Sequence, residues 1–417
     1  MKYKITTKEF SLIVIGGGPA GFMGAITAAE KGVGSVLILE KLNSSLEKVR
    51  ISGGGRCNVT HDCWDPKDLV TNYPRGRYEL LSPFHRFSTI EAIDWFKERG
   101  LDLLVEPDGR MFPSTNSSSD VIACLKKSAS LAGVIQLNHS KVLSVKTSED
   151  DKFRCELSNG TIFKAKRILL ATGNSPVGMK IAKKFGHTII EPVPSLFSLV
   201  LNDSFLSSSS GIAVDDVNVK LLSNNRVFQK KGRILITHKG LSGPVILKLS
   251  AFAARDLYID NYKCILKINW AGLNRSEVED VYVVSKNKYR SKPIGQFSPY
   301  KNIPKRLWNC FLLLSGINSR YNFSNITKIQ EMKLIDIISN HKLQVKSKGP
   351  FGEEFVKAGG ISLKEVDFKT MESLKKKGLF LAGEILDIDG VTGGFNFQQC
   401  WTTGWISGLS IYDSLNK

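Results

Sequence analysis

The sequence predicts an α/β protein whose main domain is a helix-covered parallel sheet assembled from both ends of the chain. Residues 12–15 form an apolar segment that leads into a glycine-rich turn. The apolar segments 168–170 and 379–382 end in glycine turns as well, which is typical of buried parallel strands. Between them, from about residue 195 to 355, the chain changes to short β-like runs followed by helices. We therefore expect residues 1–194 and 356–417 to form one discontinuous domain and residues 195–355 to form a second, inserted one.

The first glycine-rich turn has the spacing of a dinucleotide-binding motif. Gly16, Gly18 and Gly21 give the pattern G-x-G-x-x-G between the strand at 12–15 and a predicted helix at 18–31. In this pattern the first glycine permits a tight turn, the second lets a pyrophosphate approach the backbone, and the third lets helix and strand pack closely. The next predicted strand, 36–39, ends at Glu40, whose carboxylate can accept hydrogen bonds from a ribose. This part of the predicted cofactor site comprises Gly16, Gly18, Pro19, Ala20, Gly21, Glu40 and Lys41.

Size and composition exclude several other classes of protein. With 417 residues, of which 42% are hydrophobic, the chain has the composition of a soluble protein with two or three domains. No apolar run approaches the roughly 18 residues of a membrane span, and the basic lead 1–10 precedes too short an apolar segment for a signal peptide. The seven cysteines include no C-x-x-C pair, which argues against a zinc knuckle or a redox dithiol. We expect a cytoplasmic protein with reduced thiols, no metal site and no membrane span.

The net charge of +19 has two interpretations. It can indicate a nucleic-acid partner, or it can reflect a lysine-rich composition combined with anionic cofactors. Residues 262–306 carry ten Lys or Arg against three acidic residues, with aromatic residues interleaved. No known nucleic-acid motif accompanies this stretch, so both interpretations stay open, and the sequence does not indicate the oligomeric state.

A second glycine-rich block points to a family. Residues 52–58 read Ser-Gly-Gly-Gly-Arg-Cys-Asn, and three consecutive glycines are costly in chain entropy unless the backbone must lie against a ligand. This block resembles the BaiN/RdsA-type (YhiN-like) FAD-dependent oxidoreductases of the glutathione-reductase-like flavoprotein superfamily. The resemblance covers the whole chain and is strongest at 16–21, 52–58, 234–244 and 378–398. It implies an FAD-binding domain of the glutathione-reductase type, and we interpret the insertion as a β-barrel with a small helical subdomain.

The resemblance extends the cofactor site to several distant segments. We expect a closing helix over 397–414 with Asn396 as its N-cap. The free N–H groups at the N-terminus of this helix would face the reduced flavin ring. A meander beginning at Val142 would reach the adenine, and turns after the second and third strands would meet the ribityl and phosphate groups. The additional predicted contacts are Ser52, Gly53, Gly54, Arg56, Cys57, Asn58, Val142, Ala171, Thr172, Gly173, Gly383, Glu384, Asp389, Gly393, Gly394, Phe395 and Asn396.

Two residues are candidates for catalysis. His238 lies in the block 234–244, which resembles a family signature and which we expect to form a loop over the cofactor. The alternative for a single histidine is a structural hydrogen bond. Arg56 can steady the reduced flavin or an anionic substrate, or it can make a phosphate or structural contact. Cys57 has no second thiol at a redox spacing, which favours a packing role.

The chain has no second G-x-G-x-x-G pattern after a strand, and therefore no signature of a separate nicotinamide domain. Our first hypothesis is an NAD(P)H-linked flavin reductase of an activated C=C bond or similar small organic substrate, with NAD(P)H binding transiently. The alternatives are an amine-type oxidase that releases hydrogen peroxide and a basic flavoprotein that acts on RNA through residues 262–306.

Overall fold

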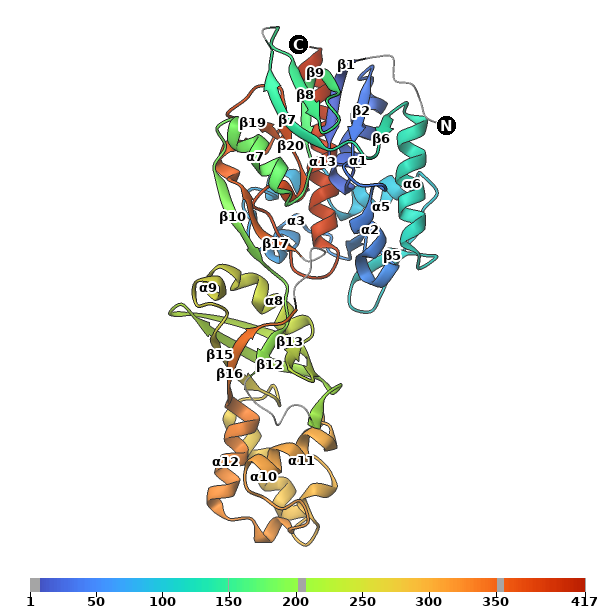
Figure 1. The fold of residues 1–417 in the computed structure, drawn as a ribbon. Helices are drawn as coiled ribbons and strands as arrows, with labels where there is room; N and C mark the ends of the chain where they lie inside the picture. Colours follow the sequence, from blue (N-terminus) through green and yellow to red (C-terminus); the bar gives the residue numbers. More distant parts are fainter. Residues whose placement is uncertain (1–7, 149, 202–207, 351–355, 417) are drawn as a thin grey trace. The chain divides into compact units, whose positions relative to one another are not determined.

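The computed structural model describes residues 8–148, 150–201, 208–350 and 356–416 (Figure 1). The chain divides into two compact units, which are described separately below. Unit 1 combines Met1–Pro192 with Lys357–Lys417, and unit 2 is Val193–Val356. The predicted boundaries followed residues 194 and 355. Among the described residues, no helix combines the length and the apolar character that a membrane crossing requires.

Unit 1 is built on a nine-stranded sheet with a parallel centre. Its central strands lie in the order β20-β9-β1-β2-β6, and β7 and β8 form an antiparallel meander that leads into β9. The strand that we predicted at 168–170 is the end of a longer strand, β9, which begins at Ile162. The strands of the sheet are β1 (Glu9–Ile15), β2 (Val36–Leu39), β6 (Ile135–Leu137), β7 (Val142–Thr147), β8 (Phe153–Leu157), β9 (Ile162–Leu170), β18 (Val366–Asp367), β19 (Glu372–Ser373) and β20 (Leu379–Leu381).

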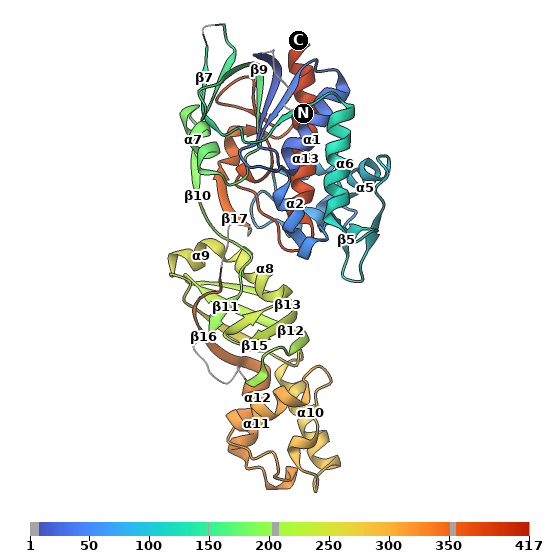
Figure 2. The ribbon, with the colours of Figure 1, turned by 45° about the vertical axis from the view of Figure 1, so that its right-hand side comes forward.

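Helices cover this sheet, and two of them are in very close contact. A Cβ atom on Gly404 of α13 would lie 2.5 Å from the Ala20 carbonyl oxygen of α1, and one on Gly408 would lie 2.7 Å from that of Gly24. Only glycine fits at these crossings, which lets the two helices pack in direct backbone contact. In both views α13 runs alongside α1 (Figures 1 and 2). A capping box formed by Ser88 and Glu91 begins α5. The helices are α1 (Pro19–Lys31), α2 (Glu47–Ile51), α3 (Pro66–Leu69), α4 (Leu81–Phe84), α5 (Thr89–Lys97), α6 (Ser118–Leu131), α7 (Pro176–Lys184) and α13 (Phe395–Leu415).

The closing helix starts earlier than we predicted. Gly394, with φ +93°, is the N-cap of α13, and the helix begins at Phe395, so the prediction of Asn396 as N-cap is wrong. The physical reason is steric, because a Cβ atom on Gly394 would lie 2.4 Å from the Thr60 carbonyl oxygen. The amide of Asn396 instead accepts from the Gly390 N–H and donates to the Gly390 carbonyl, which closes the loop before the helix.

Two small sheets in unit 1 were not predicted. Strands β3 (Thr60–His61), β5 (Arg110–Pro113) and β4 (Leu103–Val105) form one of them. The other pairs β10 (Ile189–Pro194) with β17 (Lys357–Ile361). Most of these strands are short, and β3 and β10 pair with segments that are distant in the chain, so local periodicity carries little signal for them.

Unit 2 confirms the predicted barrel with a helical subdomain. Six strands close in the order β11-β14-β13-β12-β15-β16 around side chains such as Val219, Leu266 and Leu343. The block 234–244, expected as a loop, is the hairpin of β13 and β14 followed by the start of α8. The elements are β11 (Leu199–Leu201), β12 (Ala213–Ser223), β13 (Arg226–Thr237), β14 (Gly240–Ser242), α8 (Pro244–Phe252), α9 (Ala254–Ile259), β15 (Cys264–Asn269), α10 (Arg275–Lys288), α11 (Lys305–Leu314), α12 (Lys328–Asn340) and β16 (His341–Lys348).

Candidate functional site

The predicted cofactor loops meet at one edge of the parallel sheet in unit 1. Ile15 of β1 lies opposite both Leu39 of β2 and Leu170 of β9, and Leu170 lies opposite Leu381 of β20. The four strands therefore end at the same level, and the loop that follows each of them lies beside its neighbours. In doubly wound α/β sheets this carboxyl edge is where ligands bind.

The three glycines of the first turn differ in what surrounds them. A Cβ atom on Gly16, whose φ is +109°, would lie 2.4 Å from the Ala171 carbonyl oxygen. One on Gly21 would lie 2.1 Å from the Gly16 carbonyl oxygen, so helix α1 packs directly on the turn. A Cβ atom on Gly18 would meet no heavy atom within 4 Å. The turn thus has two glycines that packing requires and one that leaves its backbone open to a ligand, as a pyrophosphate site needs.

Glu40 holds this turn from the next strand. Its carboxylate accepts hydrogen bonds from the Gly17 and Leu42 N–H groups, each at 2.8 Å. The Glu40 carbonyl accepts from the Ser140 N–H at 2.7 Å, which ties the start of the meander near Val142 to the same place. An ionised carboxylate has further lone pairs beyond these two bonds, so Glu40 retains acceptor capacity for ribose hydroxyls. Lys41 is exposed beside it.

The loop after β20 brings in a lysine that the sequence analysis missed. Gly383 donates its N–H to Thr403 Oγ1 of α13 at 3.0 Å, and a Cβ atom on Gly383 would lie 2.8 Å from Ala20 Cβ of α1. The next residue, Glu384, pairs with Lys48 Nζ at 2.6 Å, and this carboxylate raises the pKa of Lys48. A Cβ atom on Gly173 would lie 3.8 Å from Glu384 Oε2, so the Ala171-Thr172-Gly173 turn adjoins the same pair.

The block 52–58 forms a tight turn with an open side. Gly53 and Gly54 have φ values of +57° and +70°, and a Cβ atom on Gly54 would meet nothing within 4 Å. The N–H of Cys57 donates back to the Ser52 carbonyl at 3.1 Å. Cys57 is completely buried, and burial raises the pKa of its thiol to about 12, so the thiol is protonated at neutral pH. These features agree with a packing role for the Cys57 side chain.

Arg56 is engaged by protein groups. Its guanidinium donates to Glu106 Oε1 at 2.5 Å and to Asn116 Oδ1 at 2.7 Å, and it stacks 3.9 Å above the ring centroid of Phe112. Arg110 pairs with the same Glu106. This geometry is that of a structural contact, and a role for Arg56 toward the flavin or a substrate stays a prediction.

The N-terminus of α13 is held from several sides. His61 Nδ1 donates to the Gly393 carbonyl at 2.9 Å, and its ring lies 4.6 Å from that of Phe395. Tyr73 donates its hydroxyl to the Phe395 carbonyl at 2.7 Å, and Asp389, fully buried, is paired with Arg75. The first N–H groups of a helix have no intrahelical partner, so this terminus presents donors and the positive end of a helix dipole. His61 had not been predicted as a site residue.

The other catalytic candidate lies on unit 2. His238 is exposed in the turn that joins β13 and β14. Its catalytic role therefore stays a prediction, as do the individual contacts expected for the cofactor.

Three buried side-chain oxygens in unit 1 support a bound polar cofactor. Asn58 Oδ1, Asn174 Oδ1 and Gln399 Oε1 make no hydrogen bond within the described residues. Asn58 ends the glycine-rich block, Asn174 follows Gly173, and Gln399 precedes Cys400, which contacts Gly383. A buried acceptor without a donor costs about 1–3 kcal/mol. Hydroxyl-rich groups such as the ribityl chain of FAD would supply donors, so the residues present fit this cofactor.

Comparison with known families decides the assignment. The model of the HI0933-like protein Rossmann domain matches residues 10–410. The chain belongs to the HI0933-like family. It is 28% identical over 406 residues to the 3-dehydro-bile acid delta(4,6)-reductase of Clostridium scindens, covering 95% of this chain and 97% of that protein. It is 29% identical over 416 residues to the ribosomal RNA dihydrouridine synthase of Haemophilus influenzae, covering 96% and 98%.

Solved structures show the same fold at low identity. The open conformation of a flavocytochrome c3 fumarate reductase has a TM-score of 0.52 at 16% identity, over 98% of this chain and 79% of that one. A 3-ketosteroid-delta4-(5alpha)-dehydrogenase from Rhodococcus jostii RHA1 has a TM-score of 0.51 at 13% identity, over 98% of both chains. The family and the fold class predicted from the sequence are confirmed, and so is the FAD-dependent oxidoreductase class.

Proposed function

We propose that the chain uses FAD to reduce a carbon–carbon double bond conjugated to a carbonyl, and that its substrate is a uridine in RNA. Two relatives covered almost completely by this chain bear names that describe such a reduction. A 3-dehydro steroid with a delta(4,6) system and the uracil ring both contain a C=C bond conjugated to a carbonyl. This common chemistry is the C=C reduction of our first hypothesis.

The distribution of charge carries the choice of RNA. Unit 2 contains 24 Lys or Arg against 12 Asp or Glu, and so holds +12 of the net +19 in 164 of the 417 residues. Unit 1 holds 34 against 27, or +7, in the remaining 253. A basic surplus concentrated in one unit is the electrostatic pattern expected for a polyanionic partner. An RNA substrate accounts for this surplus, and we place the reaction in the cytoplasm.

Within unit 1, the chain's own groups would bind and orient the cofactor. The turn at Gly18 and the N-terminus of α1 would take the pyrophosphate, and Glu40 would accept hydrogen bonds from the adenosine ribose. Bound FAD, once reduced by NAD(P)H, would supply the hydride for the double bond. The N-terminus of α13, which begins after Gly394, would stabilise negative charge on the reduced ring through its free N–H groups and its dipole. His238 stays our candidate for moving a proton.

The test is an anaerobic titration of the purified flavoprotein. We expect NADH or NADPH to bleach the flavin absorbance and a uridine-containing RNA to restore it, with dihydrouridine appearing in the RNA by mass spectrometry. Bleaching by an amine without NAD(P)H would instead indicate the amine-oxidase alternative. Flavin that NAD(P)H reduces but only a steroid enone reoxidises would refute the RNA substrate and leave the conjugated-alkene reaction in place. The bile-acid relative makes that second substrate class a specific candidate.

A further inference from the structure

The outer wall of the barrel in unit 2 carries three lysines in one register row. Across the antiparallel strands, Lys220 of β12 lies opposite Lys267 of β15, and Lys267 lies opposite Lys342 of β16. The alternating residues Leu221, Leu266 and Leu343 are buried in the barrel core. Because side chains alternate along a strand, the three lysines point outward on the same face. We call these three residues the lysine row.

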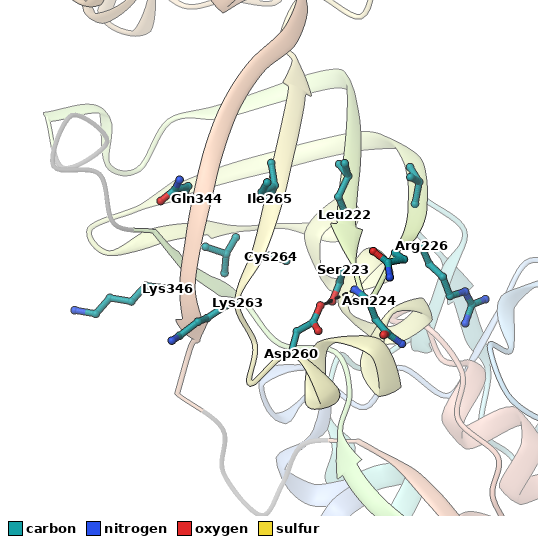
Figure 3. Close-up of a pocket in the computed structure, with 13 residues that line it drawn as sticks. Leu222, Ser223, Asn224, Arg226, Asp260, Lys263, Cys264, Ile265, Gln344 and Lys346 are labelled. Carbon is teal, nitrogen blue, oxygen red and sulfur yellow. Dashed lines mark hydrogen bonds between the residues drawn. The ribbon is translucent and has the colours of Figure 1, made fainter.

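A hollow adjoins the lysine row on this face. A second register row lies two residues from the lysine row on each strand. In it Leu222 lies opposite Ile265, and Ile265 lies opposite Gln344, which gives a largely apolar strip. This strip lines a hollow of about 670 Å³, with Lys263 and Lys346 on its far side (Figure 3). The hollow also contains one carboxylate, Asp260, which accepts from Ser223 Oγ at 2.7 Å and from the Asn224 N–H. Arg226 completes its rim.

The lysine row is electrostatically unfavourable for the barrel alone. Like charges directly opposite each other on an antiparallel pair destabilise it. Within residues 208–350, some basic residues of unit 2 form ion pairs, such as Lys231 with Asp216 and Lys286 with Glu331. No such ion pair reaches Lys220, Lys267 or Lys342 from any carboxylate that the structure describes, and Lys220 and Lys342 are exposed. A bound polyanion would offset this repulsion.

The spacing suits a nucleic-acid backbone. Neighbouring strands lie about 4.8 Å apart, so the lysine row spans about 10 Å, and Lys263 lies four residues, about 13 Å, from Lys267 along the strand. Two lines of positive charge therefore flank the apolar strip. We infer that this face of the barrel binds the phosphate backbone of RNA, with the strip of Leu222 and Ile265 beneath sugar and base. The inference depends on the proposed function for its choice of RNA as the polyanion.

This surface differs from the stretch that the sequence suggested. Of the ten basic residues counted in 262–306, only Lys263 and Lys267 lie on this face. The others belong to α10, to α11 and to the segments around them. Lys220 and Lys342 come from strands far away in the chain, and only the register of the barrel unites them.

The first test is the charge-reversal variant K220E/K267E/K342E in the intact flavoprotein. The probe is a fluorescein-labelled 20-nucleotide RNA hairpin with a uridine-containing loop, followed by fluorescence anisotropy at several salt concentrations. Loss of three phosphate contacts should weaken binding at least about tenfold and lower the slope of log K against log salt by about 2–3. The matched control is K180E/K183E/K184E on the exposed side of α7, which makes the same change in net charge. Equal losses in both variants would overturn the inference.

A single substitution separates binding from folding. Lys267→Glu places a carboxylate opposite Lys220 and Lys342, and should raise the thermal midpoint by about 1–3 °C while it weakens RNA binding. A fall in both quantities would mean that the barrel is damaged and would overturn the inference. Bleaching by NAD(P)H should not change in any of these variants.

The result with the unmodified protein keeps the two proposals apart. If the lysine-row variant and the control variant bind the RNA hairpin with equal affinity, only the proposed surface is overturned. No hairpin binding by the unmodified protein, with NAD(P)H bleaching intact, overturns both the surface and the RNA substrate. Row-dependent binding to phosphatidylglycerol vesicles without binding to the hairpin also overturns the inference, because the partner is then a lipid surface.

Discussion

Gly18→Ala should separate cofactor binding from folding more cleanly than any other substitution in the first turn. Gly18 has φ −92° and ψ −174°, an extended conformation that alanine adopts without strain, and its Cβ position is open to 4 Å. The apoprotein should therefore be as stable as the parent, or about 0.4–1 kcal/mol more stable, because alanine restricts the unfolded chain. The added methyl group would occupy the space through which the pyrophosphate approaches. We expect the Kd for FAD to rise at least about tenfold, or 1.4 kcal/mol.

Gly21→Ala is the contrasting variant in the same motif. Its methyl group would lie 2.1 Å from the Gly16 carbonyl oxygen, so the turn and α1 must separate. We expect a loss of about 1–3 kcal/mol in the free energy of unfolding of the apoprotein. Urea unfolding without flavin and quenching of flavin fluorescence give the two quantities. If Gly18→Ala bound FAD like the parent, the pyrophosphate would not lie over Gly18 and the site described above would be wrong.

Three further predictions concern other parts of the molecule. Asp389→Asn removes the buried partner of Arg75 and should lower the free energy of unfolding by about 3–5 kcal/mol in urea titrations. His341 accepts from Trp270 Nε1, and burial lowers its pKa to about 4 from an ordinary 6.5, so the unfolded chain binds the proton more tightly. Stability should be complete above pH 6.5 and fall by roughly 3 kcal/mol as the pH drops through 4, a loss that His341→Gln should reduce in urea unfolding at several pH values. Cys57→Ala should leave NAD(P)H-driven bleaching unchanged, and native Cys57 should resist iodoacetamide at pH 8, because its pKa is raised to about 12.

The parts of the site that the sequence predicted well are those with local geometric rules. The strand at 12–15, the glycine spacing that ends at Gly21 and the carboxylate of Glu40 follow one another within about thirty residues. Together they form a pattern that can be read within one short segment, although Gly16 also packs against Ala171 from a distant strand. Their predicted elements agree with β1, α1 and β2 to within a few residues.

The parts that could not be predicted depend on contacts between distant segments. The cap of α13 falls on Gly394 because Thr60 of β3 approaches it, and nothing near residue 394 in the sequence records that approach. Lys48 became visible as a site residue only through its pairing with Glu384, 336 positions later. A polar residue within a few positions of a glycine turn resembles a helix cap, and Asn396 was mistaken for one, whereas its amide closes the loop from Gly390.

The cofactor site of this chain does not distinguish between the substrates named for its relatives. Both named relatives align with at least 95% of this chain, so the whole framework is common to proteins with very different substrate names. The loops around Gly18 and Glu40 are suited to the cofactor and say nothing about a steroid or an RNA. A row of like charges is a feature that an uncharged or singly charged substrate would not require. The basic surplus of unit 2 is accordingly the observation that favours RNA, and the lysine row is the surface through which we infer that the RNA is held.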